Sequence, residues 1–299
     1  VLEGGILSSG GIVKFGPGSI GASFSEERSG MLLEDTTLIL QTNLDLPYLQ
    51  FSGTSNFQTN GNTLSLVDLE IGIVSELDFT NLVFNSNSVL RLIGNSAITK
   101  TGDLVFKEIE LEGYSLTLNT AITSLTAENI DLPTWDSDHP NYLASTGTLL
   151  AQGVDVTVTK QRYIDKGTIE MGGGTLTLEQ GGELGEGGEL DLSNSTLVLS
   201  GPFYNHNGMG TLTTSASTLS LKSNVKFEPG NDVTFSTYEP NGWGMVLHND
   251  MDNSSATTHL TLGTNGVDLI LQPNTEALTS GFVNYYSSQN GAVFSTHNH

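Results

Sequence analysis

Two irregular segments of the chain, each containing a tryptophan, place carboxylates two residues apart, and they are the first candidates for chemistry. Asp136 and Asp138 lie beside Trp135, and Asp250 and Asp252 form a second such pair. Oxygen ligands with this spacing on a loop can share a calcium ion. We therefore name Asp136, Asp138, Asp250 and Asp252 as candidate Ca²⁺ ligands, although the complete EF-hand and glycine-rich nonapeptide patterns are missing. The alternative is that both segments are solvated acidic loops.

The chain's two tryptophans each have a tyrosine nearby, which indicates a second kind of site. Trp135 precedes Tyr142, and Tyr238 precedes Trp243. Flat aromatic faces beside Asp and Asn side chains suit stacking on sugar rings. These four residues are therefore candidate ligand-binding residues. The alternative is that each aromatic side chain anchors its segment against the rest of the fold.

The sequence carries no recognisable catalytic constellation. Its only arginines are Arg28, Arg91 and Arg162, and no Lys or Arg occurs in residues 227–299. A polysaccharide lyase needs such a base beside its calcium ligands, and a glycoside hydrolase needs paired carboxylates. No Asp-Asp, His-Gly or Arg-x-Lys element is present. We expect no catalytic residue and no required cofactor, and keep a polysaccharide-degrading enzyme as the alternative.

The net charge of the chain limits the classes of molecule that it can bind. The chain has 10 Lys+Arg against 33 Asp+Glu, a net charge of −23. Such a surface repels nucleic acids and anionic membranes and favours divalent cations or cationic partners. There is no cysteine, and no apolar run is long enough to cross a membrane as a helix. The first residues also lack the pattern of a secretory leader.

A repeat of 21 to 22 residues organises the middle of the chain. Leu176, Leu197 and Leu219 lie 21 and 22 residues apart within similar Leu-x-Leu segments. Two further series share this period: Leu190, Leu212 and Val233, and Leu184, Phe203 and Val225. Three apolar series with one period predict a coil with three short strands, because each coil can bury its apolar residues only by stacking on its neighbours.

The first half of the chain shows a similar period. Leu64, Phe84, Leu104 and Leu125 are spaced by 20, 20 and 21 residues. We predict an all-β fold, a right-handed parallel β-helix (β-solenoid) with coils of about 20–22 residues. Residues 1–299 are expected to form a single solenoid domain. Loops are expected near 133–147 and 236–258, where prolines and tryptophans interrupt the strand pattern.

An acidic stretch in the repeat suggests dependence on cations. Between Lys166 and Lys222 the chain carries Glu170, Glu179, Glu183, Glu186, Glu189 and Asp191 with no base among them. Stacked coils would place several of them on one face. Like charges that close are destabilising unless a cation bridges them. Calcium-dependent stability is one interpretation, and a solvated acidic face is the other.

The coils around Leu176, Leu197 and Leu219, together with polar turns, acidity and absence of cysteine, resemble bacterial surface adhesins and autotransporter passenger domains. The resemblance implies a secreted or cell-surface location. It also implies a structural or adhesive role, in contact with an extracellular glycan or protein or with like subunits. It transfers no functional residue. A carbohydrate-binding module and a viral tail-fibre or spike segment remain the alternatives.

Overall fold

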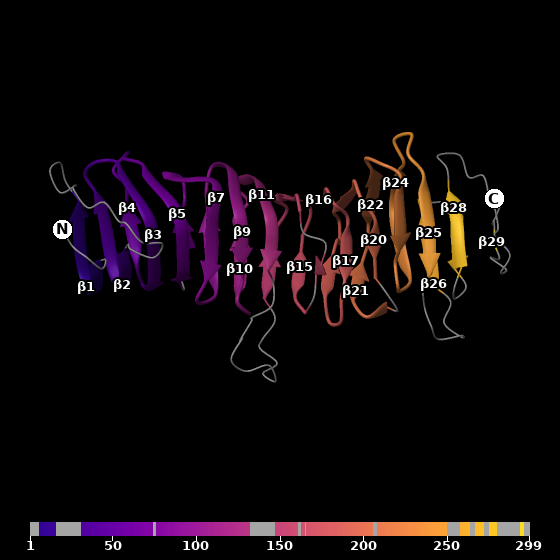
Figure 1. The fold of residues 1–299 in the computed structure, drawn as a ribbon, viewed down its shortest axis with the longest axis horizontal. Helices are drawn as coiled ribbons and strands as arrows, with labels where there is room; N and C mark the ends of the chain where they lie inside the picture. The colour runs from indigo at the N-terminus through magenta and orange to yellow at the C-terminus, as the bar shows by residue number, and fades with distance from the viewer. Residues whose placement is uncertain are drawn as a thin grey trace. The chain divides into compact units, whose positions relative to one another are not determined.

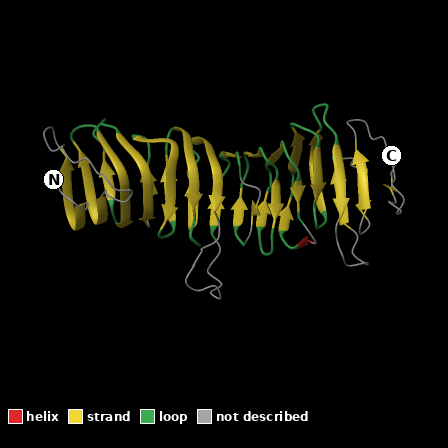
Figure 2. Ribbon diagram, viewed as in Figure 1, coloured by secondary structure: helices red, strands yellow, loops and turns green. Residues whose placement is uncertain are grey.

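A computed structural model describes most of the chain. The described residues are 6–15, 31–73, 76–131, 147–160, 163–164, 166–205, 208–249, 258–263, 267–271, 275–279 and 294–295. Within these ranges the backbone forms strands joined by short turns and no α-helix occurs; the short red segment in Figure 2 is a 3₁₀ turn at Gly208. None of the described segments is a helix that could span a membrane. The strands stack in parallel as a β-solenoid of about 9 turns.

The chain divides into two compact units, residues 1–149 and 150–299, and Figure 1 labels many of the strands of each. Strand β12 (Thr148–Leu150) spans the boundary. The other strands of unit 1 are β1 (Ile6–Phe15), β2 (Met31–Leu40), β3 (Leu44–Gly53), β4 (Asn56–Gln58), β5 (Leu64–Ile73), β6 (Glu76–Asp78), β7 (Leu82–Leu92), β8 (Ser96–Thr99), β9 (Gly102–Glu110), β10 (Ser115–Leu118) and β11 (Ile122–Asp131).

Unit 2 is built from shorter strands. They are β13 (Asp155–Val158), β14 (Tyr163–Ile164), β15 (Thr168–Glu170), β16 (Thr175–Leu178), β17 (Gly182–Leu184), β18 (Glu189–Asp191), β19 (Thr196–Leu199), β20 (Phe203–Tyr204), β21 (Thr211–Thr213), β22 (Ser217–Leu221), β23 (Val225–Glu228), β24 (Val233–Glu239), β25 (Met245–Asn249), β26 (Thr258–Leu262), β27 (Val267–Leu271), β28 (Thr275–Thr279) and β29 (Phe294–Ser295).

The register within unit 2 confirms the predicted Leu176 series and the first step of the Leu190 series. Leu176 of β16 pairs with Leu197 of β19, which pairs with Leu219 of β22, all in parallel. Leu190 of β18 likewise pairs with Leu212 of β21. All five leucines are at most 2% exposed. Like residues therefore stack in columns that line one interior, as the equal coil length requires. The rest of the prediction is wrong in register: Val233 lies on β24 in another sheet, and Phe203 pairs with Gly182 and Phe227, not with Leu184 and Val225.

Unit 1 uses the same coil with longer strands. In β5, Leu64, Leu66, Leu69 and Ile71 are all buried, while Val67 between them is 40% exposed. Inward side chains normally alternate every second residue, so a gap of three means that the strand turns a corner there. The paired strand β7 shifts register at the same place, between Leu66 and Asp68 of β5. One long strand thus covers two faces of the coil that separate strands cover in unit 2.

Aromatic rings of successive coils contact one another in each unit. Phe203 of β20 pairs in register with Phe227 of β23, and their ring centroids lie 5.5 Å apart. Phe84 of β7 lies 4.7 Å from Phe106 of β9. Such ring pairs stabilise a fold by about 0.5–1.5 kcal/mol beyond the burial of their area. They fix the position of one coil on the next.

Turn side chains also join coils, which explains why Asn and Asp are frequent there. In six places an Asn or Asp side-chain oxygen accepts a hydrogen bond from a backbone N–H of a following coil, over 2.7–3.0 Å. The pairs are Asp35 with Thr54, Asn43 with Thr63, Asn95 with Ser115, Asp155 with Thr175, Asn224 with Gly244, and Asp232 with His259. Backbone groups at the turns thereby gain partners that the strand ladders do not supply.

The parallel stack ends in a reversal of chain direction. β26 pairs with β27, β27 with β29, and β25 with β28, all antiparallel. Every other recorded strand pairing within the two units is parallel. A last coil that folds back in this way covers strand edges that a simple stack would leave open.

Two predicted irregular regions can be compared with the structure. β24 continues to Glu239 and β25 occupies Met245–Asn249, so these parts of the loop predicted at 236–258 are strands. Residues 250–257, and all of the loop predicted at 133–147 except residue 147, lie outside the described residues. The right-handed sense and the single-domain organisation stay predictions.

Candidate functional site

The structure describes two of the eight residues predicted to bind a ligand or metal. Tyr238 lies in β24, and Trp243 lies in the turn between β24 and β25. Trp135, Tyr142, Asp136, Asp138, Asp250 and Asp252 lie outside the described residues. The two proposed calcium pairs and one proposed aromatic pair therefore stay predictions.

Trp243 and Tyr238 sit differently in the fold. Trp243 is 42% exposed, and its backbone N–H donates to the Pro240 carbonyl over 2.8 Å to close the turn. Tyr238 is half-buried and pairs in register with Leu219, a buried residue of the coil below. Trp243 thus presents an aromatic surface to solvent, whereas Tyr238 belongs to the stack of coils.

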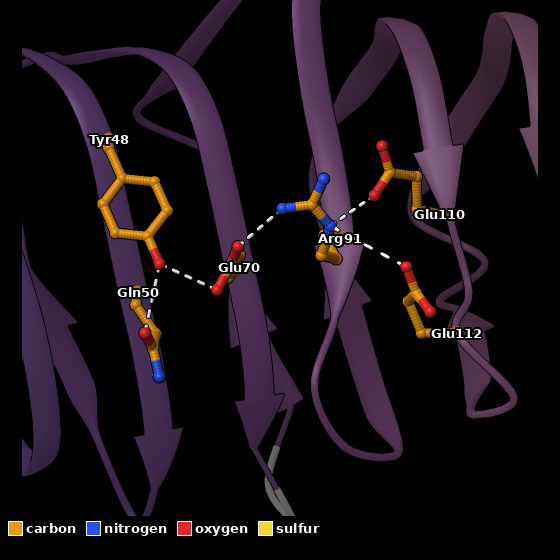
Figure 3. Close-up of polar contacts among 6 residues, drawn as sticks. All are labelled: Tyr48, Gln50, Glu70, Arg91, Glu110 and Glu112. Carbon is orange, nitrogen blue, oxygen red and sulfur yellow. Dashed lines mark hydrogen bonds and ion pairs between the residues drawn. The ribbon is translucent and has the colours of Figure 1, made fainter. Parts of the chain in front are cut away.

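The most organised polar group lies on the outer surface of unit 1. Gln50 of β3, Glu70 of β5, Arg91 of β7 and Glu110 of β9 pair in register, one per coil. Each follows an inward apolar residue, such as Leu69 before Glu70. Because neighbouring side chains of a strand point to opposite faces, all four project outward from adjacent strands (Figure 3). We call these four residues the Arg91 column.

Arg91 holds the column together. Its Nη1 lies 2.7 Å from Glu70 Oε1, and its Nε donates to Glu110. Glu112, in the turn after β9, lies 3.9 Å from Nε. On the other side, the Tyr48 hydroxyl donates to Glu70 Oε2 over 2.7 Å (Figure 3). The guanidinium therefore joins three coils through charge-assisted hydrogen bonds.

One guanidinium faces three carboxylates, which leaves the group net negative. The hydrogen bond with Glu110 is the main reason that the pKa of Arg91 is raised. Burial raises the pKa of Glu112, with a further contribution from the nearby Glu110. Partial burial makes each of these interactions stronger than on an open surface, where an ion pair contributes 1 kcal/mol or less.

Asp131 of β11 adds a further carboxylate beside the Arg91 column, one coil beyond Glu110. It pairs in register with Glu110. Burial, followed by the charges of Glu108, Glu112 and Glu110, raises the pKa of Asp131 to about 6. Its carboxylate is therefore disfavoured in the folded state near neutral pH.

Asp131→Asn is expected to stabilise the protein above pH 6. Because the folded-state pKa of Asp131, about 6, lies above the ordinary value of 3.8, the folded state binds the extra proton, and stability falls as pH rises between these values. The carboxamide removes this loss. We expect a gain of about 1 kcal/mol above pH 6, discounted for solvent screening. Thermal unfolding across the pH range measures it.

A second variant tests the cause. Glu108 is the charge with the largest effect on Asp131 after burial. Glu108→Gln should therefore shift the pH at which stability falls towards lower values. A profile that is the same in wild type, Asp131→Asn and Glu108→Gln would contradict the assigned role of Asp131.

Several residues of the acidic stretch 170–191 share one sheet, as predicted. Glu170 of β15 pairs with Asp191 of β18, and Glu189 of β18 accepts a hydrogen bond from Thr168 over 3.2 Å. Glu183, by contrast, lies on β17 in a different sheet. Among the described residues, no group of three His, Asp or Glu side chains is placed to hold a metal ion.

The Arg91 column was not identified from the sequence, although a signal was present. Glu70, Arg91 and Glu110 are spaced by 21 and 19 residues, which matches the coil length. Each also follows a leucine or isoleucine of the inward series. Aligning the outward positions of successive coils, as was done for the inward leucines, would have placed these three charges together.

Comparison with known proteins gives no family for the chain. No family model matches it, and no similar curated protein or solved structure is found.

Proposed function

We propose that the chain is a structural or adhesive β-solenoid of a secreted or cell-surface protein. The observation that supports this best is the register of outward side chains in successive coils. A solenoid repeats its outward positions at the spacing of strands in a sheet, about 4.8 Å, and so offers an extended surface for many weak contacts. The Arg91 column is one such series.

The net charge defines the partners that this surface fits. With a charge of −23, the outer face favours cationic or neutral partners and disfavours nucleic acid. Extracellular proteins, neutral glycans and like subunits meet this condition. Calcium ions are further candidates for the acidic segments, and no cofactor is needed for the proposed role.

Carbohydrate binding is the second candidate function. It is favoured by Trp243, a large aromatic side chain that is 42% exposed on a turn. Aromatic rings in such positions stack on sugar rings. Such a contact would give an adhesive solenoid its specificity.

An adhesion assay and a glycan array together test the proposal. The purified chain is expected to bind immobilised cells or matrix proteins without releasing reducing sugars from any polysaccharide. Trp243→Ala should lose glycan binding if the tryptophan carries it, and Tyr114→Ala, which removes another exposed aromatic, serves as the control. Release of reducing ends would favour the enzyme, and a compact trimer in a size measurement would favour the fibre segment.

A further inference from the structure

Four turns of the structure share one conformation. They are Thr59–Asn62, Leu111–Tyr114, Ala151–Val154 and Pro240–Trp243, each closed by a hydrogen bond from the N–H of its last residue to the carbonyl of its first. Both central residues have positive φ in every case, and the second is always glycine. This is the type I′ turn, which Asn-Gly favours most strongly.

Two of the four turns carry Asn-Gly at the centre. Asn60 and Gly61 have φ values of 50° and 80°, and Asn241 and Gly242 have values of 53° and 86°. All four residues are exposed. No heavy atom lies within 4 Å of the position that a Cβ would take on either glycine. Both turns are therefore uncrowded at the glycine.

We propose that Asn60 is a site of spontaneous modification, where deamidation of Asn60-Gly61 loosens a turn on the coil below. The backbone nitrogen of Gly61 attacks Cγ of Asn60, the bond from Cγ to Nδ2 breaks, and ammonia leaves with the proton of the Gly61 amide. Water then opens the resulting succinimide at either carbonyl, which gives an aspartyl or isoaspartyl residue. Asparagine is among the residues known to limit protein lifetime at high temperature.

The contacts of the two asparagines predict which reacts first. Asn60 Nδ2 donates to one recorded acceptor, the Leu40 carbonyl, over 3.1 Å. Asn241 Nδ2 donates to Ser220 Oγ, the Leu221 carbonyl and the Glu239 carbonyl, over 3.0–3.2 Å. The side chain must leave these acceptors before Cγ can meet the glycine nitrogen. The two protons of the Asn241 NH2 are shared among three acceptors, whereas Asn60 has one, so Asn241 is expected to react about tenfold more slowly.

The reaction has a structural consequence at Asn60. The product is a carboxylate, which cannot donate to the Leu40 carbonyl, so that carbonyl keeps only the Asn62 Nδ2 donor, at 3.3 Å. In the isoaspartyl form the backbone also runs through Cβ, which adds one atom to a turn whose length is matched to the coil. The turn between β4 and β5 is therefore expected to be held less tightly to the coil below.

Peptide mapping by mass spectrometry tests the proposal on the full chain. The protein is held in mildly alkaline buffer, and the mass gain of deamidation is followed at each asparagine. We expect Asn60 to convert about tenfold faster than Asn241. The Gln152-Gly153 turn, which has the same backbone, should not change because its ring would need one more atom. Asn207, Asn265 and Asn290 also precede glycine and lie outside the described residues, so their peptides are followed separately.

Matched variants complete the test. Asn60→Gln should remove the modification at this turn and leave the conversion of Asn241 unchanged. A short peptide with the sequence around Asn60 serves as the unfolded reference. If Asn60 stays unmodified while the peptide is fully converted, or if Asn241 converts as fast as Asn60, the proposal is overturned.

Discussion

Asn205→Ala is expected to destabilise the protein by about 4 kcal/mol, because the side chain satisfies several buried backbone groups at once. Asn205 is 0% exposed. Its Nδ2 donates to the carbonyls of Gly210 and Pro229 over 3.0 and 2.9 Å. Its Oδ1 accepts from the N–H of Gly210 over 2.9 Å. Alanine would leave all three groups buried without these partners.

A second substitution, Asn205→Asp, tests the directions of these hydrogen bonds. In Asn205→Asp the shape is kept, but an oxygen replaces the donor that faces the Gly210 and Pro229 carbonyls. We therefore expect Asn205→Asp to destabilise at least as much as Asn205→Ala at neutral pH. Denaturant unfolding measures both changes.

Asn119 provides the matched control. Its Oδ1 accepts from the N–H of Ala121 in an exposed turn, over 3.0 Å. Asn119→Asp keeps that acceptor, so stability should change by only about 0.5 kcal/mol. If Asn205→Asp were as well tolerated as Asn119→Asp, the buried network would not be what holds this part of unit 2.

Gly181→Ala is expected to cost more than about 3 kcal/mol or to prevent folding, because two backbones approach each other closely at this residue. A Cβ on Gly181 would lie 1.9 Å from the Pro202 carbonyl oxygen of the next coil. That oxygen already accepts a hydrogen bond from Gly182 N–H over 2.8 Å. Relief of the overlap would break the pairing between the two coils.

Gly187→Ala is the control that distinguishes steric overlap from backbone strain. The φ of Gly187 is +77°, close to the +83° of Gly181, but no atom lies within 4 Å of a Cβ placed on Gly187. Gly187→Ala should therefore cost only the strain of a left-handed residue, about 1–2 kcal/mol. Thermal midpoints of the two variants give the comparison. Equal losses would mean that the coils separate easily at Gly181.

The inward columns could be predicted from the sequence because they repeat one residue type at one spacing. The series through Leu176 and Leu190 are the examples. The prediction fails after β22, where Ser217 pairs with Phe235, only 18 residues on. A shorter coil on that face breaks the period, so the strand at 236–239 was interpreted as loop.

Polar contacts were harder to predict than the columns. Arg91 meets Glu70 and Glu110 only once outward positions are aligned coil by coil. Asn205 looks like an ordinary turn residue in the sequence. Its hydrogen-bond partners, Gly210 and Pro229, lie five and 24 residues further along the chain. No pattern in the sequence around Asn205 predicts these contacts.

The corner between Leu66 and Asp68 has a consequence for how such a chain can change in evolution. Leu66 pairs with Phe84, but Asp68 pairs with Val89, so the coil of β7 holds three extra residues there without disturbing the columns on either side. Insertions and deletions at corners are thus absorbed locally, whereas a single residue added within a strand would invert every side chain after it. Duplication or loss of one whole coil would likewise preserve the alignment. Descendants of this gene can therefore differ in length and turn sequence while retaining the same interior.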